Sequence, residues 1–301
     1  MPSEMYNKSE PDELESGQVI ALKQNEAKAF LHKFFGKRAA VISACFILLL
    51  FVIAILAPLF EPFNPATPDY NAILSGPSLH HLCGTDEFGR DIFSRLIAGS
   101  RLSLSVSLSS VTIGAVIGAF LGIIAGFYGG WIDQLIMRFC DVLFAFPDLL
   151  LAIAIVAVLG AGLSNVVIAV AVFSVPSFAR IMRSSTLSIK NMLYVDVARS
   201  LGCSRRRIMW KHIMPATLAS IIVNFTMRIG TAILAAASLS FLGFGAKPTE
   251  PDWGAMLSTG RNYLSTAPYI VYFSGGIIFL TVLAFNLLGD GIRDTLDPKI
   301  Q

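Results

Sequence analysis

The sequence predicts an all-α membrane protein with six transmembrane helices and both termini in the cytoplasm. Hydrophobic residues make up 54% of the 301-residue chain and charged residues only 14%, and the mean hydropathy is +0.68. A soluble protein carries about 25% charged residues, so this chain lacks the polar surface that globular domains need in water. Long charge-free stretches and an uneven distribution of Lys and Arg along the chain support the same prediction.

The first membrane helix is predicted at residues 39–60, after a cytoplasmic tail formed by residues 1–38. A lipid core of about 30 Å needs about 20 apolar residues per helix. Residues 39–60 carry no charge. The tail begins with acidic residues and has few hydrophobic ones, unlike the short basic start of a cleavable signal peptide. We therefore expect a disordered tail followed by a membrane helix that is not cleaved off.

Residues 61–101 are predicted to form a periplasmic segment that contains an amphipathic helix. Thr85 is placed to cap this helix, with Asp86 and Glu87 in its first turn. The apolar residues that would share one face are Phe88, Ile92, Phe93, Leu96 and Ile97. The helix could lie on the outer face of the membrane, or simply pack on its own protein without any ligand role.

Residues 102–290 are predicted to hold the other five membrane helices. The stretches 102–132 and 262–289 are free of charge, and the stretch 212–246 contains only Arg228. The more polar stretch 136–182 is divided by Gly160, Ala161 and Gly162 into two apolar blocks, each long enough for one crossing. With the helix at 39–60, these stretches make six spans.

The positions of the basic residues predict the orientation of these spans. If the N-terminus is cytoplasmic, 17 of the 23 Lys and Arg residues lie inside and five lie outside, with Arg228 left within a span. Cytoplasmic loops carry the excess of Lys and Arg in membrane proteins. Residues 291–301 then form a second cytoplasmic tail.

A second polar segment, residues 184–214, is predicted to form a helix-turn-helix element on the cytoplasmic face. Gly202 can end one short helix in a left-handed turn, and Ser204 can cap the next helix. Pro215 can then sit in the first turn of the fifth membrane helix. The basic residues of this segment also fit a second interpretation, in which they only orient the chain near anionic lipid head groups. Nucleic acid is not an expected partner, because both ends of the segment enter the membrane at once.

Several kinds of site are not predicted from this sequence. The only Gly-Lys pair, at Gly36, is followed by Arg38 and so cannot form a phosphate-binding loop. The four cysteines lie far apart with no C-x-x-C, and the adjacent His80 and His81 lack a third metal ligand nearby. No histidine is placed to activate a serine at membrane depth. We therefore predict neither an enzyme nor a cofactor or metal site in this chain.

The spacing Asp196, Ala198, Gly202 and Pro215 resembles the E-A-A, G, P loop of the membrane subunits of bacterial ABC importers, which docks on the ATP-binding subunit. The family usually has Glu-Ala-Ala where this chain has Asp196-Val197-Ala198. From about residue 30 onward, the chain also resembles the C-type permease of the dipeptide, oligopeptide, nickel and glutathione importers. The motifs that carry this resemblance are Gly84-Thr85-Asp86, Gly89-Arg90-Asp91, Ser94-Arg95, Asp141 to Pro147, Ser240 to Gly243, Trp253-Gly254 and Asn286 to Asp294. The run at residues 225–230 looks most like the glutathione-type members.

The resemblance implies a type I ABC importer permease fold in the bacterial inner membrane, and a peptide as the substrate class. It implies partners as well: a homologous permease, two ATP-binding subunits that hold ATP and Mg²⁺, and a periplasmic substrate-binding protein, all around a chain embedded in the lipid bilayer. The loop 184–214 would move as a rigid lever when the ATPase pair closes. An ion or small-solute channel that works without an ATPase is the alternative function, and a secondary transporter is disfavoured because no inverted repeat is visible.

Two charged residues inside the predicted spans are candidates for the translocation pathway. Arg228 lies 13 residues after Pro215, or about 20 Å along a helix. A charge at that depth needs a protein partner or water. Arg228 could therefore form a salt bridge, with Asp148 as one candidate partner, or offer a positive charge to a substrate carboxylate. Asp148 follows Pro147, and it could cap the inner half of a kinked helix or face the pathway and pair with a cation.

Overall fold

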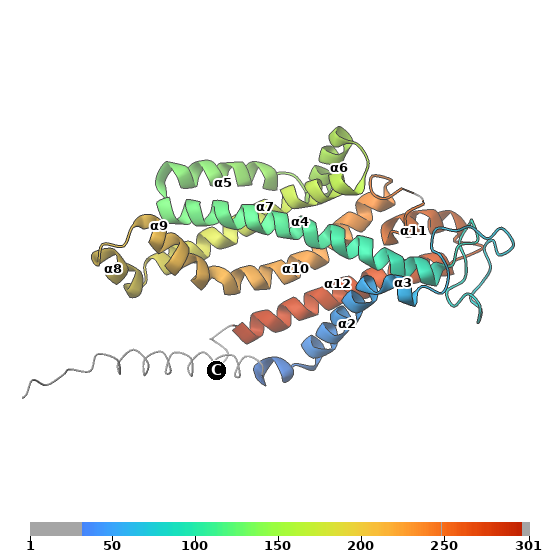
Figure 1. Ribbon diagram of the computed structural model, residues 1–301. Coiled ribbons are helices and arrows are strands. Elements are labelled where there is room, and N and C mark those ends of the chain that lie inside the picture. Colours follow the sequence, from blue (N-terminus) through green and yellow to red (C-terminus); the bar gives the residue numbers. More distant parts are fainter. Residues whose placement is uncertain (1–31, 248, 297–301) are drawn as a thin grey trace, which may run out of the picture.

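The fold is a bundle of long helices, shown in Figure 1. The computed structural model describes residues 32–247 and 249–296, so most of the predicted N-terminal tail and residues 297–301 lie outside the described residues. Within them the helices are α2 (Arg38–Ile55), α3 (Ala57–Phe60), α4 (Ile92–Tyr128), α5 (Gly130–Phe144), α6 (Asp148–Leu159), α7 (Leu163–Lys190), α8 (Leu193–Ser200), α9 (Arg205–Arg207), a π-helical turn (Ile208–Ile213), α10 (Met214–Phe241), α11 (Trp253–Gly260), a 3-10 turn (Arg261–Tyr263) and α12 (Tyr269–Leu296). The all-α prediction is confirmed for this part of the chain, where strand pairing is limited to one bridge between Thr85 and Asp91.

Five helices in the described residues are long and apolar enough to cross a membrane, and a bent pair makes a sixth candidate. The five are α2, α4, α7, the continuous helix 205–241, and α12. The bent pair is α5 and α6, which meet at an angle of 89°. The sequence predicted a kink at Pro147, and the break is sharper than a kink because α5 already ends at Phe144. Six spans are therefore obtained only when α5 and α6 are counted together.

Helices α4 and α7 pack closely because α4 presents glycines to α7 at every fourth position. A Cβ atom added at Gly114, Gly118, Gly122 or Gly126 would lie only 2.7, 2.5, 2.3 or 2.8 Å from an atom of α7. Residues four apart lie on one face of a helix, and glycine there lets two backbones approach closely. This pair of helices forms the rigid centre of the bundle against which the other elements are placed.

We expect the substitution Gly122→Leu to destabilise the protein by about 1–3 kcal/mol or more, because the new side chain has no space between α4 and α7. Gly276→Leu is the matched control, since Gly276 of α12 also lies within a helix but has no atom within 4 Å of an added Cβ. The measurement is the melting temperature of each purified variant in detergent. Equal melting temperatures for the two variants would show that the α4–α7 contact is not this tight.

The prediction of an amphipathic helix that begins after Thr85 is wrong. Helix α4 begins at Ile92, with Asp91 as its N-cap, and then continues without interruption through the apolar stretch to Tyr128. The Asp91 carboxylate accepts a hydrogen bond from the backbone N–H of Ser94 at 2.7 Å. The apolar residues expected on an interfacial helix face instead belong to the start of a membrane helix, and Ile92 and Ile97 are buried in the bundle.

Residues 84–91 form a loop because Asp86 binds local backbone groups that a helix would need. Its carboxylate accepts hydrogen bonds from the N–H groups of Phe88 and Arg90, both at 2.9 Å. Gly84 and Gly89 have φ angles of +78° and +74°, which turn the chain in a way that few other residues tolerate. The Arg90 guanidinium donates from Nε to the same Asp86 carboxylate at 2.7 Å. The motif residues of this segment therefore build the fixed loop that precedes α4.

The motif residues near 240–254 pack helix α11 against α4 and α10. The Trp253 side chain is fully buried and donates a hydrogen bond from Nε1 to the carbonyl of Leu96 at 3.0 Å. A Cβ atom at Gly254 would lie 2.3 Å from the carbonyl oxygen of Ala237. Asp252 caps α11 by accepting from the N–H of Ala255, and burial raises the pKa of its carboxyl group. These residues fix the end of the bundle opposite α8 (Figure 1).

Candidate functional site

The predicted helix-turn-helix element lies at one end of the bundle, where α8 and α9 extend beyond the other helices (Figure 1). Gly202 ends α8 with a φ angle of +79°, as the sequence predicted. Its N–H donates to the carbonyl of Arg199 at 3.0 Å, and the N–H of Cys203 donates to the carbonyl of Ala198 at 3.1 Å. This pair of hydrogen bonds is the Schellman arrangement that a glycine C-cap produces. The Ser204 hydroxyl then accepts from the N–H of Arg207 at 3.4 Å and caps α9.

The second half of this element differs from the prediction because it has no break before the membrane helix. Helix α9, the π-helical turn and α10 form one continuous helix from Arg205 to Phe241. Pro215 lies in the first turn of α10, as predicted, but inside this longer helix. The N–H of Met214 bonds to the carbonyl of Met209, five residues earlier. The wider π turn lets the helix pass a proline that lacks an N–H.

Helix α8 packs one face against the rest of the protein, and its opposite face is apolar and exposed. Val195 and Ala198 are buried, so Ala198 of the predicted site is a packing residue. Asp196 is on the open side, 56% exposed, and its carboxylate lies 3.3 Å from Nη1 of Arg199. Leu193, Val197 and Leu201 are 79, 49 and 79% exposed. These three residues follow a four-residue spacing, and that spacing was the signal in the sequence that could have revealed this exposed apolar stripe.

The two pathway candidates lie next to each other. Nη1 of Arg228 on α10 lies 3.3 Å from Oδ2 of Asp148 on α6. The Arg228 side chain is 14% exposed and the Asp148 side chain 46%. The Arg228 guanidinium also lies 5.9 Å from the centre of the Phe173 ring on α7. Asp148 occupies the first turn of α6, where a negative charge is favourable, and its carboxylate meets Arg228 as well.

Two further Arg–Asp pairs, which the sequence analysis missed, connect α5 with α7. Nη2 of Arg180 donates to Oδ1 of Asp141 at 3.0 Å, and Nη2 of Arg183 donates to Oδ2 of Asp133 at 2.6 Å. Together with the Arg228–Asp148 pair they place every acid on α5 or α6 and every base on α7 or α10. We call this set of three pairs the charged-pair face. The seven- or eight-residue spacing of Asp133, Asp141 and Asp148 was the signal available in the sequence.

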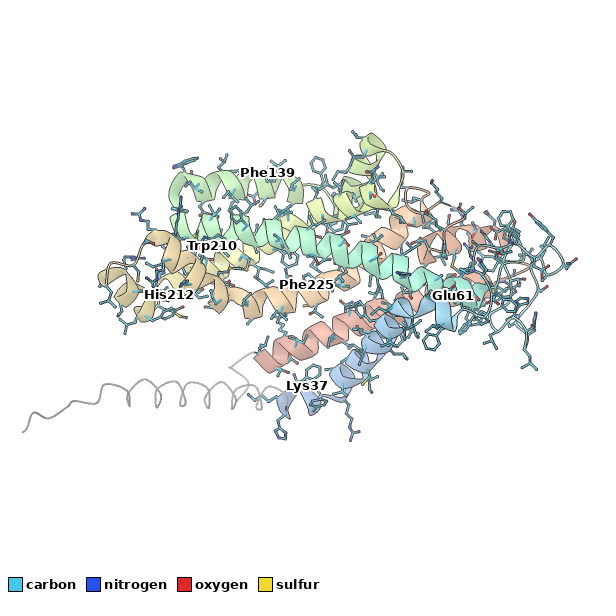
Figure 2. All side chains as sticks on the ribbon, in the orientation of Figure 1. Lys37, Glu61, Phe139, Trp210, His212 and Phe225 are labelled. Carbon is cyan, nitrogen blue, oxygen red and sulfur yellow. The ribbon has the colours of Figure 1, made fainter. Side chains whose placement is uncertain are left out.

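The charged-pair face is unsuited to contact with lipid tails. Its charges lie on helices that are candidate membrane spans, and a half-exposed ion pair at membrane depth needs water or protein beside it. The broken backbone at residues 145–147 has the same requirement, because lipid offers no hydrogen bonds to free peptide groups. Phe139 of α5, shown in Figure 2, is 56% exposed. It lies about half a turn around the helix from Asp141, so α5 presents an apolar side and a charged side.

Comparisons with known proteins agree with this architecture. A family model for the inner membrane component of binding-protein-dependent transport systems matches residues 118–301, and one for the N-terminal transmembrane domain of oligopeptide transport permease C matches residues 27–77. The chain is 54% identical over 273 residues to the glutathione transport system permease protein GsiD of Escherichia coli O6:K15:H31 (strain 536 / UPEC), covering 90% of each chain. The protein of that name from Shigella boydii serotype 4 (strain Sb227) has the same identity and coverage.

Solved structures show the same fold at low sequence identity. Chains from two inward-facing crystal forms of the MetNI methionine ABC transporter match with TM-scores of 0.55 and 0.56, at 17 and 18% identity. The matches cover 67 and 68% of this chain and 97 and 98% of those chains. The family models and the 54% identical relatives confirm the family resemblance found in the sequence. The chain belongs to the family of inner membrane components of binding-protein-dependent transport systems, and it is a permease subunit of an ABC transporter rather than an enzyme.

Proposed function

We propose that this chain forms half of the translocation pathway of an ATP-driven importer for small peptides, with glutathione as the substrate. The exposed apolar stripe of α8 carries the proposal for coupling. A short helix that is fixed on one face and apolar on the other has the form of an element that docks in a groove of a partner. The 54% identity to glutathione transport permeases supports the choice of substrate.

The other components follow from this role. A homologous permease would stand opposite the charged-pair face and complete the pathway between the two chains. Two ATP-binding subunits would hold ATP and Mg²⁺ and receive α8, with Asp196, Ala198, Gly202 and Pro215 shaping the contact. A periplasmic binding protein would deliver the peptide. ATP binding can switch the bundle between its outward-open and inward-open states only if the contacts it creates are stronger in one state than in the other. A partner that binds both states equally does not shift the equilibrium between them.

We propose that α8 and both chain termini are cytoplasmic, and that residues 61–91 and 242–268 face the periplasm of a bacterial inner membrane. A reporter enzyme that is active only in the periplasm should give no signal when fused at Gln301, and a strong signal when inserted between Thr249 and Leu264. A reporter active only in the cytoplasm, fused at the same two places, is the control and should give the reverse. The opposite pattern from both reporters would overturn this orientation.

Uptake in whole cells tests the substrate and the need for partners. Cells that express this chain with a companion permease, two ATPase subunits and a binding protein should accumulate labelled glutathione. Cells that lack this chain alone should not. A channel, the alternative function, would let the label equilibrate across the membrane in cells that lack the ATPase subunits. Active accumulation of an inorganic ion in place of glutathione would contradict the peptide assignment.

A further inference from the structure

The charged-pair face contains a second arginine, Arg180, in addition to the pathway candidate Arg228. Arg180 is bound to Asp141 at 3.0 Å and lies 4.3 Å from the centre of the Phe144 ring. The side chains of Arg180 and Asp141 are 55 and 54% exposed. Arg180 lies ten residues before the end of α7 at Lys190. That separation is about 15 Å along the helix.

The guanidinium group of Arg228, which extends from α10, lies beside the face of α7 that also carries Arg180. The Arg228 guanidinium lies 5.9 Å from the ring of Phe173, and Phe173 is seven residues before Arg180 on α7. Seven residues are almost two helical turns, so positions 173 and 180 lie on the same face and about 10 Å apart. Arg180 therefore lies about 10 Å along α7 from the phenylalanine beside which the Arg228 guanidinium lies.

The pairs on this face can exchange partners because α5 and α6 are lightly packed. Helix α5 buries only Cys140, and α6 buries only Ala152 and Val156. An arginine that leaves a half-exposed aspartate for a peptide carboxylate keeps the same kind of charge-assisted hydrogen bond. The guanidinium is therefore never left as an unpaired charge at membrane depth. The Arg183–Asp133 pair is less accessible, with 34 and 17% exposed side chains, and is not part of this exchange.

We propose that Arg180 is a second carboxylate-binding residue of the translocation route, and that Arg180 and Arg228 together fit an anionic peptide of about three residues that carries two carboxylates. An extended chain covers about 3.3–3.6 Å per residue, so three residues match the spacing of about 10 Å. Asp141 and Asp148 hold the two arginines when no peptide is present. This inference rests on the proposed function, because it requires that peptides pass the charged-pair face.

The test is glutathione uptake by the complete transporter, with all its subunits reconstituted in liposomes and the rate normalised to assembled complex. Arg180→Gln should lower the rate at subsaturating glutathione by about tenfold or more, because one charge-assisted contact is lost. Asp141→Asn should retain at least about half of the rate, since it removes only the competing carboxylate and leaves Arg180 in place. Arg138→Gln is the control, because Arg138 is also an exposed arginine and lies on α5, the helix that carries Asp141. It should retain the wild-type rate.

A purely structural ion pair predicts a different pattern, in which Arg180→Gln and Asp141→Asn lose the same share of uptake. That result, or an unchanged rate for Arg180→Gln, would overturn the inference. If Arg180→Gln does not assemble, Arg180→Lys replaces it, and uptake between the wild-type and background rates is the expected result. Wild-type transporter that takes up no glutathione would overturn the proposed function and this inference together. If the wild type takes up glutathione but the variants show equal losses, or Arg180→Gln shows no loss, this inference is wrong and the proposed function stands.

Discussion

Gly202→Asp should reduce ATP-driven uptake to background while the protein remains in the membrane at a normal level. Gly202 ends α8 with φ of +79°, and no atom lies within 4 Å of an added Cβ, so the turn faces open space. A carboxylate there would not disturb packing within this chain. It would stand between α8 and the ATPase groove in which we propose that α8 docks, and would prevent the close contact that the glycine allows.

Gly243→Asp is the matched control for this prediction. Gly243 has φ of +87° and likewise has no atom within 4 Å of an added Cβ. It caps α10 with the same pair of hydrogen bonds, from Gly243 to Ser240 at 3.0 Å and from Phe244 to Leu239 at 2.9 Å. The backbone strain is therefore alike in the two variants, but Gly243 lies at the other end of the bundle. Normal uptake by Gly202→Asp, measured alongside this control, would show that the loop is not the lever.

Arg228→Met should lower the uptake of glutathione by about tenfold or more, with the complex still assembled. Methionine fills much of the space of the arginine stem and keeps an apolar contact with Phe173, so the packing between α10 and α7 is largely retained. What is lost is the positive charge, which lies mostly buried beside Asp148. The measurement is the uptake rate per complex that co-purifies with its ATPase subunits.

Asp148→Asn separates the two interpretations of the Arg228–Asp148 pair. If the pair only holds α6 to α10, then Asp148→Asn and Arg228→Met should reduce the amount of assembled complex to a similar degree. If Arg228 binds the peptide, Asp148→Asn should keep most of the uptake, because the guanidinium remains in place. Unchanged uptake of every peptide in Arg228→Met would remove Arg228 from the mechanism.

The parts of the fold that depend on local rules could be predicted from the sequence. Charge-free stretches identify spans because a lipid core allows few alternatives to an apolar helix. The cap at Gly202 and the cap at Ser204 follow from residues within one turn of each helix end. Thr85 and Asp91 are both acceptable N-caps by the same rules. The choice of Asp91 depends on distant contacts, such as the hydrogen bond from the Thr85 hydroxyl to the carbonyl of Ala72.

The Arg228–Asp148 pair was one of the alternatives that the sequence offered, because a charge deep in a span needs a partner, but the two pairs between α5 and α7 were not predicted. Arg180 and Asp141 are 39 residues apart, and Arg228 and Asp148 are 80 residues apart. The antiparallel placement of α5 and α7 brings Arg180 to Asp141, and the packing of α6 beside α10 brings Asp148 to Arg228. The near right angle between α5 and α6 could not be predicted from Pro147 either. A proline removes a backbone hydrogen bond, but it does not set the size of the bend.

The most direct test of the coupling account is glutathione accumulation by liposomes that contain this chain, its companion permease and the ATPase subunits, with the binding protein on one side and ATP and Mg²⁺ on the other. The account predicts accumulation above the external concentration in the wild type, and none when ATP is withheld or when this chain carries Gly202→Asp. Equilibration of glutathione at the same rate with and without the ATPase subunits would contradict it, because the chain would then act as a channel.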